Sequence, residues 1–502
     1  MLSATERLQA FNVMHLIRQR GYFILHAPRQ VGKTTAMLEL ARLLTASGEY
    51  ISVLLSCEVG APFSADIESA ESAIISTWHN AIRSQLPPDL RPPEWMDNVR
   101  GGGMINRFLS DWSFAASRPL VIFLDEIDAL QDNALISVLR QLRAGYPHRP
   151  EGFPASLALI GLRDVRDYKV KSGGSSRLKS PSPFNIAVRS ITLRNFTEPE
   201  VIRLLQQHTK ATGQQFTENA LAHVFYLTQG QPWLVNSLAK LCVEELVTDL
   251  AQPVEIEQVN AAKEILIQRR QTHLDSLADK LSEPRVRKII EPILSGGTME
   301  HIPQDDRDYA VDLGLVRRIN GGTLTIANPI YSEIIPRSLA SGASDSLPTL
   351  QPSWLNPDGS LDADNLLEAF LSFWRQHGQP LLRTAPYHEI APHLVMMAFL
   401  HRVANGGGFL DREYAIGSGR MDLLLRFNEQ RLAFELKVWR DGKKDPLARG
   451  LVQLDRYLSG LGLETGWLVI FDQRKGQLPI DERTSAEITQ TPSGRTITLV
   501  RA

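Results

Sequence analysis

The sequence predicts a multidomain α/β protein, and three observations lead to that prediction. Strand-like apolar runs alternate with helical patterns from Tyr22 to Ile160, which is typical of a mostly parallel sheet. A segment rich in Ser, Pro and Gly at 337–360 has the composition of an interdomain linker. A second set of helical and strand-like patterns follows it. At 502 residues, the chain is long enough for about three domains.

Composition and charge exclude several classes of protein. Lysine and arginine number 54 against 56 aspartates and glutamates, a net charge of −2, so binding to nucleic acid must come from local patches rather than a basic coat. No apolar stretch approaches the ~18 residues of a membrane span, and the N-terminus carries charges where a secretory signal is apolar. The two cysteines, Cys57 and Cys242, cannot build a disulfide framework. We expect a cytoplasmic protein with no membrane partner.

Four apolar runs predict the strands of an N-terminal sheet. Each is followed by a helical pattern, so the strands are expected to run parallel. The strand pattern ends near residue 195, which gives a first domain at 1–195. The runs are Tyr22 to His26, Ser52 to Leu55, Leu120 to Leu124 and Ser156 to Ile160.

Helices replace strands after this domain. Thr197 and Glu200 have the spacing of a capping box at a helix start. Two helical segments are later followed by two short strands around an Asn-Gly turn, an order that fits a winged helix. The expected divisions are a helical lid at 196–280, a winged helix at 281–336, the linker at 337–360 and a last domain at 361–502.

Residues 27–35, APRQVGKTT, lie between the first strand and a helical run. The backbone N–H groups of such a loop, with the N-terminus of the following helix, cradle phosphate oxygens. Lys33 is expected to reach the β- and γ-phosphates of ATP, and Thr34 to place its hydroxyl on Mg²⁺. Ala27 stands where the usual pattern has glycine, which requires a negative φ there. The expected nucleotide-binding residues are Ala27, Pro28, Arg29, Gln30, Val31, Gly32, Lys33, Thr34 and Thr35.

An acidic pair, Asp125 and Glu126, ends the apolar run PLVIFLDE. An aspartate at the carboxyl end of a neighbouring parallel strand holds Mg²⁺ through water in enzymes with such a loop. A glutamate beside it is placed to orient or deprotonate the attacking water. Asp125 is therefore predicted to share the metal site with Thr34, and Glu126 to act in catalysis.

These residues resemble the AAA-like P-loop ATPases of the AAA+ and STAND types. The segments SLALIGLRDVRDYK, SPFNI, LRNFTEPEV, QGQPWLVN and IANPIYSEIIPR resemble the sensor strand, lid helices and winged-helix end of that group. The resemblance implies ATP hydrolysis and a homo-oligomer in which a neighbouring subunit completes the site. Arg163 or Arg166 would be a sensor or an arginine finger. Alternatively, both are surface arginines that pair with nearby aspartates.

The predicted winged helix lacks the charge of a DNA reader. Its candidate recognition segment has four aspartates against Arg307 alone, and phosphates repel an acidic helix. We expect a packing or regulatory module instead. The basic loop at 163–180 is a better candidate for contact with nucleic acid, and an ordinary surface loop is the alternative. The four acids are Asp305, Asp306, Asp308 and Asp312.

A second constellation lies in the last domain. Residues 420–427 and 431–439 alternate apolar and polar side chains, which predicts an antiparallel hairpin. Glu435 and Lys437 share one face of their strand, and pairing can bring Asp422 beside them. Asp422 and Glu435 offer the oxygen ligands that Mg²⁺ or Mn²⁺ prefers, and such a metal activates water. Lys437 is placed to position that water or to stabilise the developing anion.

This hairpin resembles the PD-(D/E)xK nuclease superfamily, with Met421 in place of the proline. Gln453 and Tyr457 lie one turn apart on a predicted helix, and Q-x-x-x-Y resembles the exonuclease-like subgroup in which this helix supports the metal site. Glu389 is expected as the auxiliary acid, with Glu413 as the alternative. The resemblance implies a restriction-endonuclease-like α/β fold with the order α-β-β-β-α-β. Its substrate would be DNA, with RNA left open.

The two constellations together predict an ATP-binding and ATP-hydrolysing protein coupled to metal-dependent cleavage of DNA. By analogy of layout, such chains belong to bacterial defence or mobile elements. One alternative is an ATP-dependent signalling switch, and another is a DNA-remodelling ATPase whose nuclease-like domain only binds nucleic acid. No zinc site is expected among His388, His393 and His401, which do not form a metal-ligand face.

Overall fold

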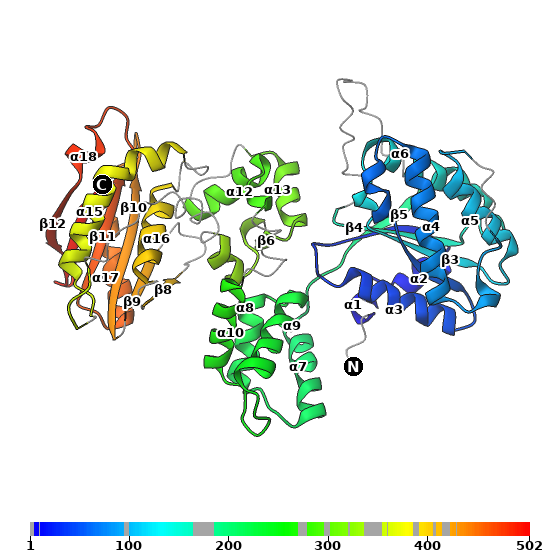
Figure 1. Cartoon of the computed structure of the whole chain (residues 1–502), viewed down its shortest axis with the longest axis horizontal. Coiled ribbons are helices and arrows are strands. Elements are labelled where there is room, and N and C mark those ends of the chain that lie inside the picture. The colour runs from blue at the N-terminus through cyan, green and yellow to red at the C-terminus, as the bar shows by residue number, and fades with distance from the viewer. Residues whose placement is uncertain are drawn as a thin grey trace. The chain divides into compact units, whose positions relative to one another are not determined.

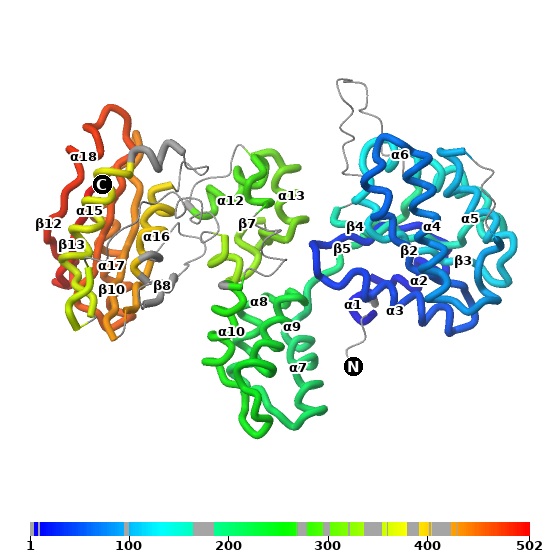
Figure 2. The backbone as a smooth tube through the Cα atoms, viewed as in Figure 1, coloured from blue at the N-terminus to red at the C-terminus, as the bar shows by residue number. Residues whose placement is uncertain are grey.

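The chain forms two compact units in the computed structural model, and each is described by itself (Figures 1 and 2). The first consists of Met1–Leu266 with Asp312–Gly314, and the second of Ile267–Val311 with Leu315–Ala502. The finer division predicted from the sequence stays a prediction. The structure describes residues 5–9, 11–94, 100–163, 185–269, 279–295, 302–319, 322–335, 354–358, 360–384, 391–404, 408–413, 422–427 and 429–502.

A parallel five-stranded sheet in the order β2-β3-β4-β1-β5 forms the centre of the first unit. All four strands predicted from apolar runs are confirmed. The fifth was missed because it lies at the sheet edge with most of its side chains partly or fully exposed, so it has no apolar run. The strands are β1 (Tyr22–His26), β2 (Ile51–Ser56), β3 (Leu120–Asp125), β4 (Ser156–Gly161) and β5 (Ala187–Thr192).

Helices cover both faces of this sheet (Figure 1). Alternate residues of a strand point to opposite faces, so Tyr22 and Phe23 enter different cores. Tyr22 packs with Trp78 and other aromatics, whereas Phe23 packs with Met37. A parallel sheet covered in this way is consistent with a P-loop NTPase fold. One face carries α4 (Ile67–Gln85), α5 (Met104–Ala115) and α6 (Asp132–Gly145), and the other α1 (Glu6–Gln9), α2 (Val13–Arg18) and α3 (Lys33–Ala46).

The helical region begins as predicted. Thr197 and Glu200 form the capping box at the start of the first helix, and the Thr197 N–H donates to the Glu200 carboxylate at 2.7 Å. Because the box satisfies backbone donors that have no partner within the helix, it fixes where the helix starts. The helices are α7 (Glu198–Thr212), α8 (Glu218–Thr228), α9 (Pro232–Leu241) and α10 (Ile256–Gln268).

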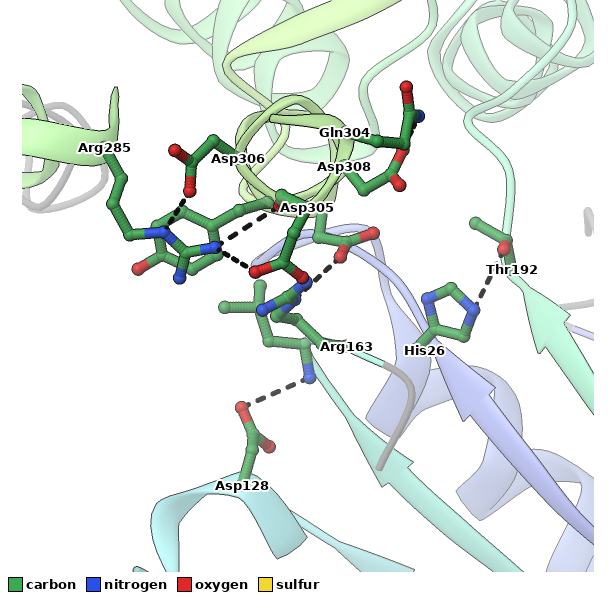
Figure 3. A network of polar contacts seen from close by, with 12 residues as sticks. His26, Asp128, Arg163, Thr192, Arg285, Gln304, Asp305, Asp306 and Asp308 are labelled. Atoms are coloured by element: carbon green, nitrogen blue, oxygen red, sulfur yellow. Dashed lines mark hydrogen bonds and ion pairs between the residues drawn. The ribbon is translucent and has the colours of Figure 1, made fainter. Parts of the chain in front are cut away.

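Two helices and a hairpin follow in the order predicted for a winged helix, an assignment that stays a prediction. These are α12 (Pro284–Ser295), α13 (Gln304–Asp312), β6 (Val316–Ile319) and β7 (Thr323–Ile326), with β6 and β7 antiparallel. The acids of α13 are paired. Arg285 donates to Asp306 at 2.6 Å and Asp305 at 2.9 Å (Figure 3), and Arg318 donates to Asp308. These ion pairs offset much of the negative charge of the helix.

A mixed six-stranded sheet in the order β12-β13-β11-β10-β9-β8 completes the second unit. The strands are β8 (Gly408–Glu413), β9 (Asp422–Phe427), β10 (Gln430–Trp439), β11 (Thr465–Asp472), β12 (Ser485–Gln490) and β13 (Thr496–Arg501). The helices are α15 (Ala363–Thr384), α16 (Ala391–Ala404), α17 (Leu447–Leu461) and α18 (Ile480–Arg483). From α16 to β11 the order is the predicted α-β-β-β-α-β.

Two helical layers enclose this sheet. Phe471 of β11 packs against Trp374 of α15 and His393 of α16. Its neighbour Ile470, on the opposite face, packs in one cluster with Leu454 of α17. The sheet therefore lies between α15 and α16 on one side and α17 on the other. Within the described part of the chain, no helix has the length and apolarity to cross a membrane.

Two candidate active sites

The predicted phosphate loop lies between the end of β1 and the start of α3. Gln30 and Gly32 adopt left-handed backbone, with φ of 57° and 86°. Ala27 is not among the residues with positive φ, as its side chain requires. A loop of this kind turns successive N–H groups inward, which is the geometry that holds phosphate oxygens.

Lys33 and Thr34 begin α3 and link this loop to the end of β3. The Lys33 ammonium donates to the carbonyl oxygens of Ala27 and Pro28 at 2.9 and 3.0 Å. The Thr34 hydroxyl donates to the Asp125 carboxylate at 2.6 Å. The structure therefore brings together the two side chains predicted to hold Mg²⁺. Burial lowers the pKa of Lys33, and Asp128, Glu126 and Asp125 act against that shift.

Glu126 follows Asp125 in a left-handed conformation, with φ of 54°. Partial burial raises the pKa of its carboxyl group, and the negative charges of Asp128 and Asp125 raise it further. A carboxylate with a raised pKa is a better proton acceptor near neutral pH. Asp128 in turn accepts from the N–H of Leu162 at 3.2 Å, which ties the end of β4 to this site (Figure 3).

Arg163, a candidate sensor or arginine finger, is buried at the end of β4. Its Nε donates to the Asp312 carboxylate at 2.8 Å, within the first unit (Figure 3). Asp312 is a partner that the sequence analysis did not consider, because it lies far away in the chain. The other candidate, Arg166, and the basic loop beyond Arg163 lie outside the described residues.

Arg7 is a residue of this site that sequence reasoning missed. Its guanidinium donates to the carbonyl oxygens of Val31 at 2.8 Å and Arg194 at 3.0 Å, and it lies over the Phe196 ring at 4.8 Å. A Cβ on Gly32 would come within 3.0 Å of the same group. Burial lowers the pKa of Arg7 to about 10. Arg7 therefore fastens the phosphate loop to the segment that leads into α7.

The same segment carries an ion pair that holds the start of α7. Arg194 donates two hydrogen bonds to the Glu200 carboxylate at 2.6 and 2.9 Å. This pair lowers the pKa of Glu200 to about 2, and the Thr197 N–H adds to the shift. Glu6 of α1 pairs with Arg203 of α7 at 2.7 Å. The N-terminal helix thus contacts both the phosphate loop and the helical region.

The second site is set by strand register. Glu435 of β10 lies directly opposite Asp422 of β9, as the predicted hairpin requires. Asp422 in turn lies opposite Glu413 of β8. Directly opposed residues in antiparallel strands have Cβ atoms roughly 5 Å apart. Glu413, the alternative auxiliary acid, therefore occupies the same row across three strands, whereas Glu389 lies outside the described residues.

Glu435 and Lys437 form a buried ion pair on this row. The Glu435 side chain is fully buried and that of Lys437 is 12% exposed. Within the described part of the chain, neither carboxylate oxygen has a partner apart from Lys437. Gln453 on α17 is 7% exposed and its Oε1 has no hydrogen-bond partner there either. These oxygens are the hard donors that Mg²⁺ accepts.

Tyr457 lies one turn after Gln453 and is also buried. The face of β10 that carries Glu435 also carries Ala433, and Ala433 packs in one cluster with Tyr457 and Leu454. The structure therefore places the predicted helix over the predicted face. Among the residues whose side chains it describes, no group of three or more His, Cys, Asp or Glu is arranged to hold a metal.

His393 is a further residue that the sequence analysis placed outside the site. It is buried on α16, and burial lowers its pKa to about 3, with the charge of Lys437 as the next cause. The imidazole is therefore neutral at neutral pH, and it lies close enough to Lys437 for the ammonium charge to disfavour its protonation. Its isolated position among apolar residues gave no signal in the sequence.

No family model matches the sequence, and no curated protein matches it. Among solved structures, the chain is similar to the RuvB Holliday junction branch migration motor of Thermotoga maritima, with 14% identity, a TM-score of 0.36 and coverage of 67% of this chain and 95% of that one. It is similar to Cdc6p from Pyrobaculum aerophilum, with 15% identity, a TM-score of 0.36 and coverage of 67% and 93%. Likeness this low transfers no function, so the functional argument rests on the residues of this chain.

Proposed function

We propose that the first unit binds and hydrolyses ATP and that the second cleaves DNA with a divalent metal. The observation that carries the nuclease assignment is the buried Glu435–Lys437 pair, opposite Asp422 and beneath the helix with Gln453 and Tyr457. The observation that carries the ATPase assignment is the Thr34–Asp125 contact beside the phosphate loop. The two sites belong to one chain, so we propose that ATP regulates or drives cleavage.

In the first unit, the loop residues would hold the triphosphate through their backbone N–H groups. Lys33 would exchange its bonds to the Ala27 and Pro28 carbonyls for the β- and γ-phosphates. Thr34 and Asp125 would hold Mg²⁺, which offsets charge on the phosphates when bound. Glu126 would orient or deprotonate the attacking water, for which its raised pKa suits it.

In the second unit, Asp422 and Glu435 would hold Mg²⁺ or Mn²⁺. A bound ion there would lower the pKa of a water and offset charge on the phosphodiester. Lys437 would position that water or stabilise the anion that develops on phosphorus. Gln453 and Tyr457 would orient these groups from α17. Glu389 or Glu413 would supply the auxiliary carboxylate.

The energetics of the buried pair support a functional role. Removing two charges from water costs several kcal/mol per ion, and replacing such a pair by apolar residues is often neutral or stabilising. A contribution to stability therefore does not explain why Glu435 and Lys437 are charged. A signalling switch needs neither residue, nor an unpartnered amide oxygen on Gln453.

The substrate, the assembly and the location are further proposals. DNA is proposed because the second site resembles a superfamily that mostly cuts DNA, and RNA is the alternative. A homo-oligomer and a role in bacterial defence or mobile elements rest on the sequence resemblance and the analogy of layout. A cytoplasmic location rests on the composition, the two cysteines and the charged N-terminus.

The test is cleavage of end-labelled linear and closed circular DNA with Mg²⁺ or Mn²⁺, with and without ATP. The proteins are wild type, Lys33→Ala, Lys437→Ala and a control, Arg456→Ala, at an exposed position of α17. We expect metal-dependent cutting that Lys437→Ala abolishes and Arg456→Ala keeps, with ATP binding retained in both. Lys33→Ala should lose ATP binding, and whether it also loses cutting separates coupled from independent units. Equal cutting by wild type and Lys437→Ala would refute the nuclease assignment. DNA-stimulated ATP hydrolysis without cutting would instead favour a remodelling ATPase.

A further inference from the structure

Three exposed lysines lie on two neighbouring loops of the second unit. Lys443 and Lys444 belong to the loop 440–446 after β10, and Lys475 to the loop 473–479 after β11. We name these three residues the basic rim. We propose that the basic rim binds the phosphate backbone of DNA and leads it to Glu435 and Lys437. The inference rests on the proposed nuclease function and goes beyond it by naming the surface that holds the substrate.

The sheet places the basic rim next to the candidate active site. Strands β10 and β11 are parallel, with Trp439 opposite Asp472, so the loops after them leave the sheet at one edge. Glu435, Lys437 and Trp439 alternate onto one face of β10. Exposure increases along this row, from the fully buried Glu435 to the half-buried Trp439. The row therefore runs from the candidate metal site outward to the rim.

The acidic residues at this edge have partners within the protein, and two of them, Asp445 and Asp472, are in ion pairs. Asp445 pairs with Arg501 at 2.9 Å, and Asp472 accepts from Arg474 at 2.7 and 2.9 Å. Asp441 accepts from the backbone N–H of Lys475 at 3.1 Å. In the part of the chain that is described, the ammonium groups of the basic rim enter no ion pair. Their charge is therefore available to a ligand.

Contacts between and within the two loops hold them in place. The Gln473 N–H donates to the Trp439 carbonyl oxygen at 2.9 Å, and the Trp439 indole N–H donates to the Lys443 carbonyl oxygen at 3.0 Å. The Arg474 guanidinium lies 3.4 Å from the centre of the Trp439 ring. A surface already held in its binding geometry loses less conformational entropy when a ligand binds.

The charge pattern favours a polyanion over other ligands. Residues 435–449, counted with the Glu435 partner of Lys437, carry five basic and three acidic side chains, in a chain whose net charge is −2. Residues 472–479, counted with the Asp472 partner of Arg474, carry two basic side chains and one acidic one. Lysines spaced along an edge suit the regularly spaced phosphates of a nucleic acid, and binding there releases counterions. DNA is the polyanion that the adjacent site is proposed to cut.

The test measures DNA binding separately from cleavage, with the full-length protein. Fluorescence anisotropy of fluorescein-labelled duplex DNA is recorded in EDTA across a series of salt concentrations. The rim variant is Lys444→Gln/Lys475→Gln, with one change in each loop. The matched control is Arg431→Gln/Arg456→Gln, which removes two exposed charges from the start of β10 and from α17.

We expect the rim variant to bind DNA more weakly and with less salt dependence. Its slope of log K against log salt should fall by about 1.8, since each lost phosphate contact contributes roughly 0.9. The control should keep the wild-type slope. With Mg²⁺ present, the rim variant should raise KM for DNA and leave kcat unchanged, because the groups at the metal site are intact.

An unchanged slope and affinity in the rim variant would overturn the inference, and so would an equal loss in the control. Binding to phosphatidylserine vesicles but not to DNA would overturn it in favour of a lipid surface. Failure of the proposed nuclease function would give a different result from failure of this inference. If no protein cuts DNA but the rim variant still loses binding, the second unit grips DNA without cleaving it and the basic rim stands.

Discussion

The two candidate sites each centre on a lysine, and the chain positions these lysines in different ways. Lys33 belongs to a loop and helix start in which the other predicted phosphate-binding positions lie within nine residues, 27–35. Lys437 and Glu435 share a strand, and the remaining groups come from another strand and a helix through sheet register. The first site is a local motif, whereas the second exists only when strands pair correctly.

The surroundings of the two lysines also differ. Lys33 donates to backbone carbonyl oxygens, with three acids nearby that counter the effect of burial on its pKa. Lys437 is paired directly with a fully buried Glu435 and has a neutral His393 close by. Lys33 can therefore exchange its partners for phosphate at little cost. Among the residues whose side chains the structure describes, Glu435 is the charged partner of Lys437, so the second site should be sensitive to substitution of Glu435.

The largest predicted effect concerns catalysis in the first unit. Glu126→Gln should reduce the kcat for ATP hydrolysis by about 10²–10⁴-fold, the usual contribution of a general base, while ATP still binds. Nucleotide binding by calorimetry and phosphate release would be measured together. Glu58→Gln is the matched control, because Glu58 is an exposed acid close enough to influence Glu126. Wild-type turnover by Glu126→Gln would exclude Glu126 as the base.

The buried pairing of Lys437 with Glu435 predicts a large stability effect in the second unit. Glu435→Ala should lower the free energy of unfolding by about 3–5 kcal/mol, because it leaves a buried lysine unpaired. Glu435→Leu/Lys437→Met should recover most of that loss without restoring DNA cleavage. Urea unfolding followed by tryptophan fluorescence measures both. The control is Glu429→Ala, at an exposed position. A Glu435→Ala protein as stable as wild type would contradict the pairing.

A smaller effect is expected at the clamp on the phosphate loop. Arg7→Ala should lower the free energy of unfolding by about 1–3 kcal/mol, because it leaves buried carbonyl oxygens without a donor. It should also weaken ATP binding, because Arg7 no longer holds the loop in place. Arg7→Lys should restore part of both, since the single nitrogen Nη1 donates to both carbonyl oxygens and a lysine ammonium also carries several donors. Thermal unfolding with and without ATP is the measurement. Arg203→Ala, at an exposed position of α7 that pairs with Glu6, is the control. An ATP-induced stabilisation identical to wild type would contradict the clamp.

A further effect separates the acid sensitivity of the two units. The pKa of His393 falls from an ordinary 6.5 to about 3 in the fold, so the unfolded chain binds more protons and stability declines as pH falls from about 6.5. The pKa of Glu200 falls from 4.5 to about 2, so the stability it contributes is present above 4.5 and lost below it. The second unit should weaken first on acidification. His393→Leu should reduce the change in the free energy of unfolding between pH 6 and 4, whereas the control His223→Leu should leave it as in wild type. An unaltered pH profile in His393→Leu would argue against a buried neutral His393.

Local patterns determined much of this protein. The four main strands of the first unit, the capping box of α7 and the strand and helix order of the second unit follow from periodicity and short-range spacing. The phosphate loop, Asp125, Glu126 and the Glu435–Lys437 pair could be identified for the same reason. Each depends on residues close together in the chain or on the end of a recognisable apolar strand.

Only the tertiary structure decided the remaining features. The clamp of Arg7 on Val31 and Arg194, the pairing of Arg163 with Asp312 and the position of His393 near Lys437 join residues far apart in the chain. Such contacts depend on how strands and helices pack, and no single-sequence spacing encodes them. The edge strand β5 was missed for a related reason: its half-exposed side chains lack an apolar pattern, and pairing with β1 defines it. Sequence therefore specifies the chemical groups, and packing determines which of them meet.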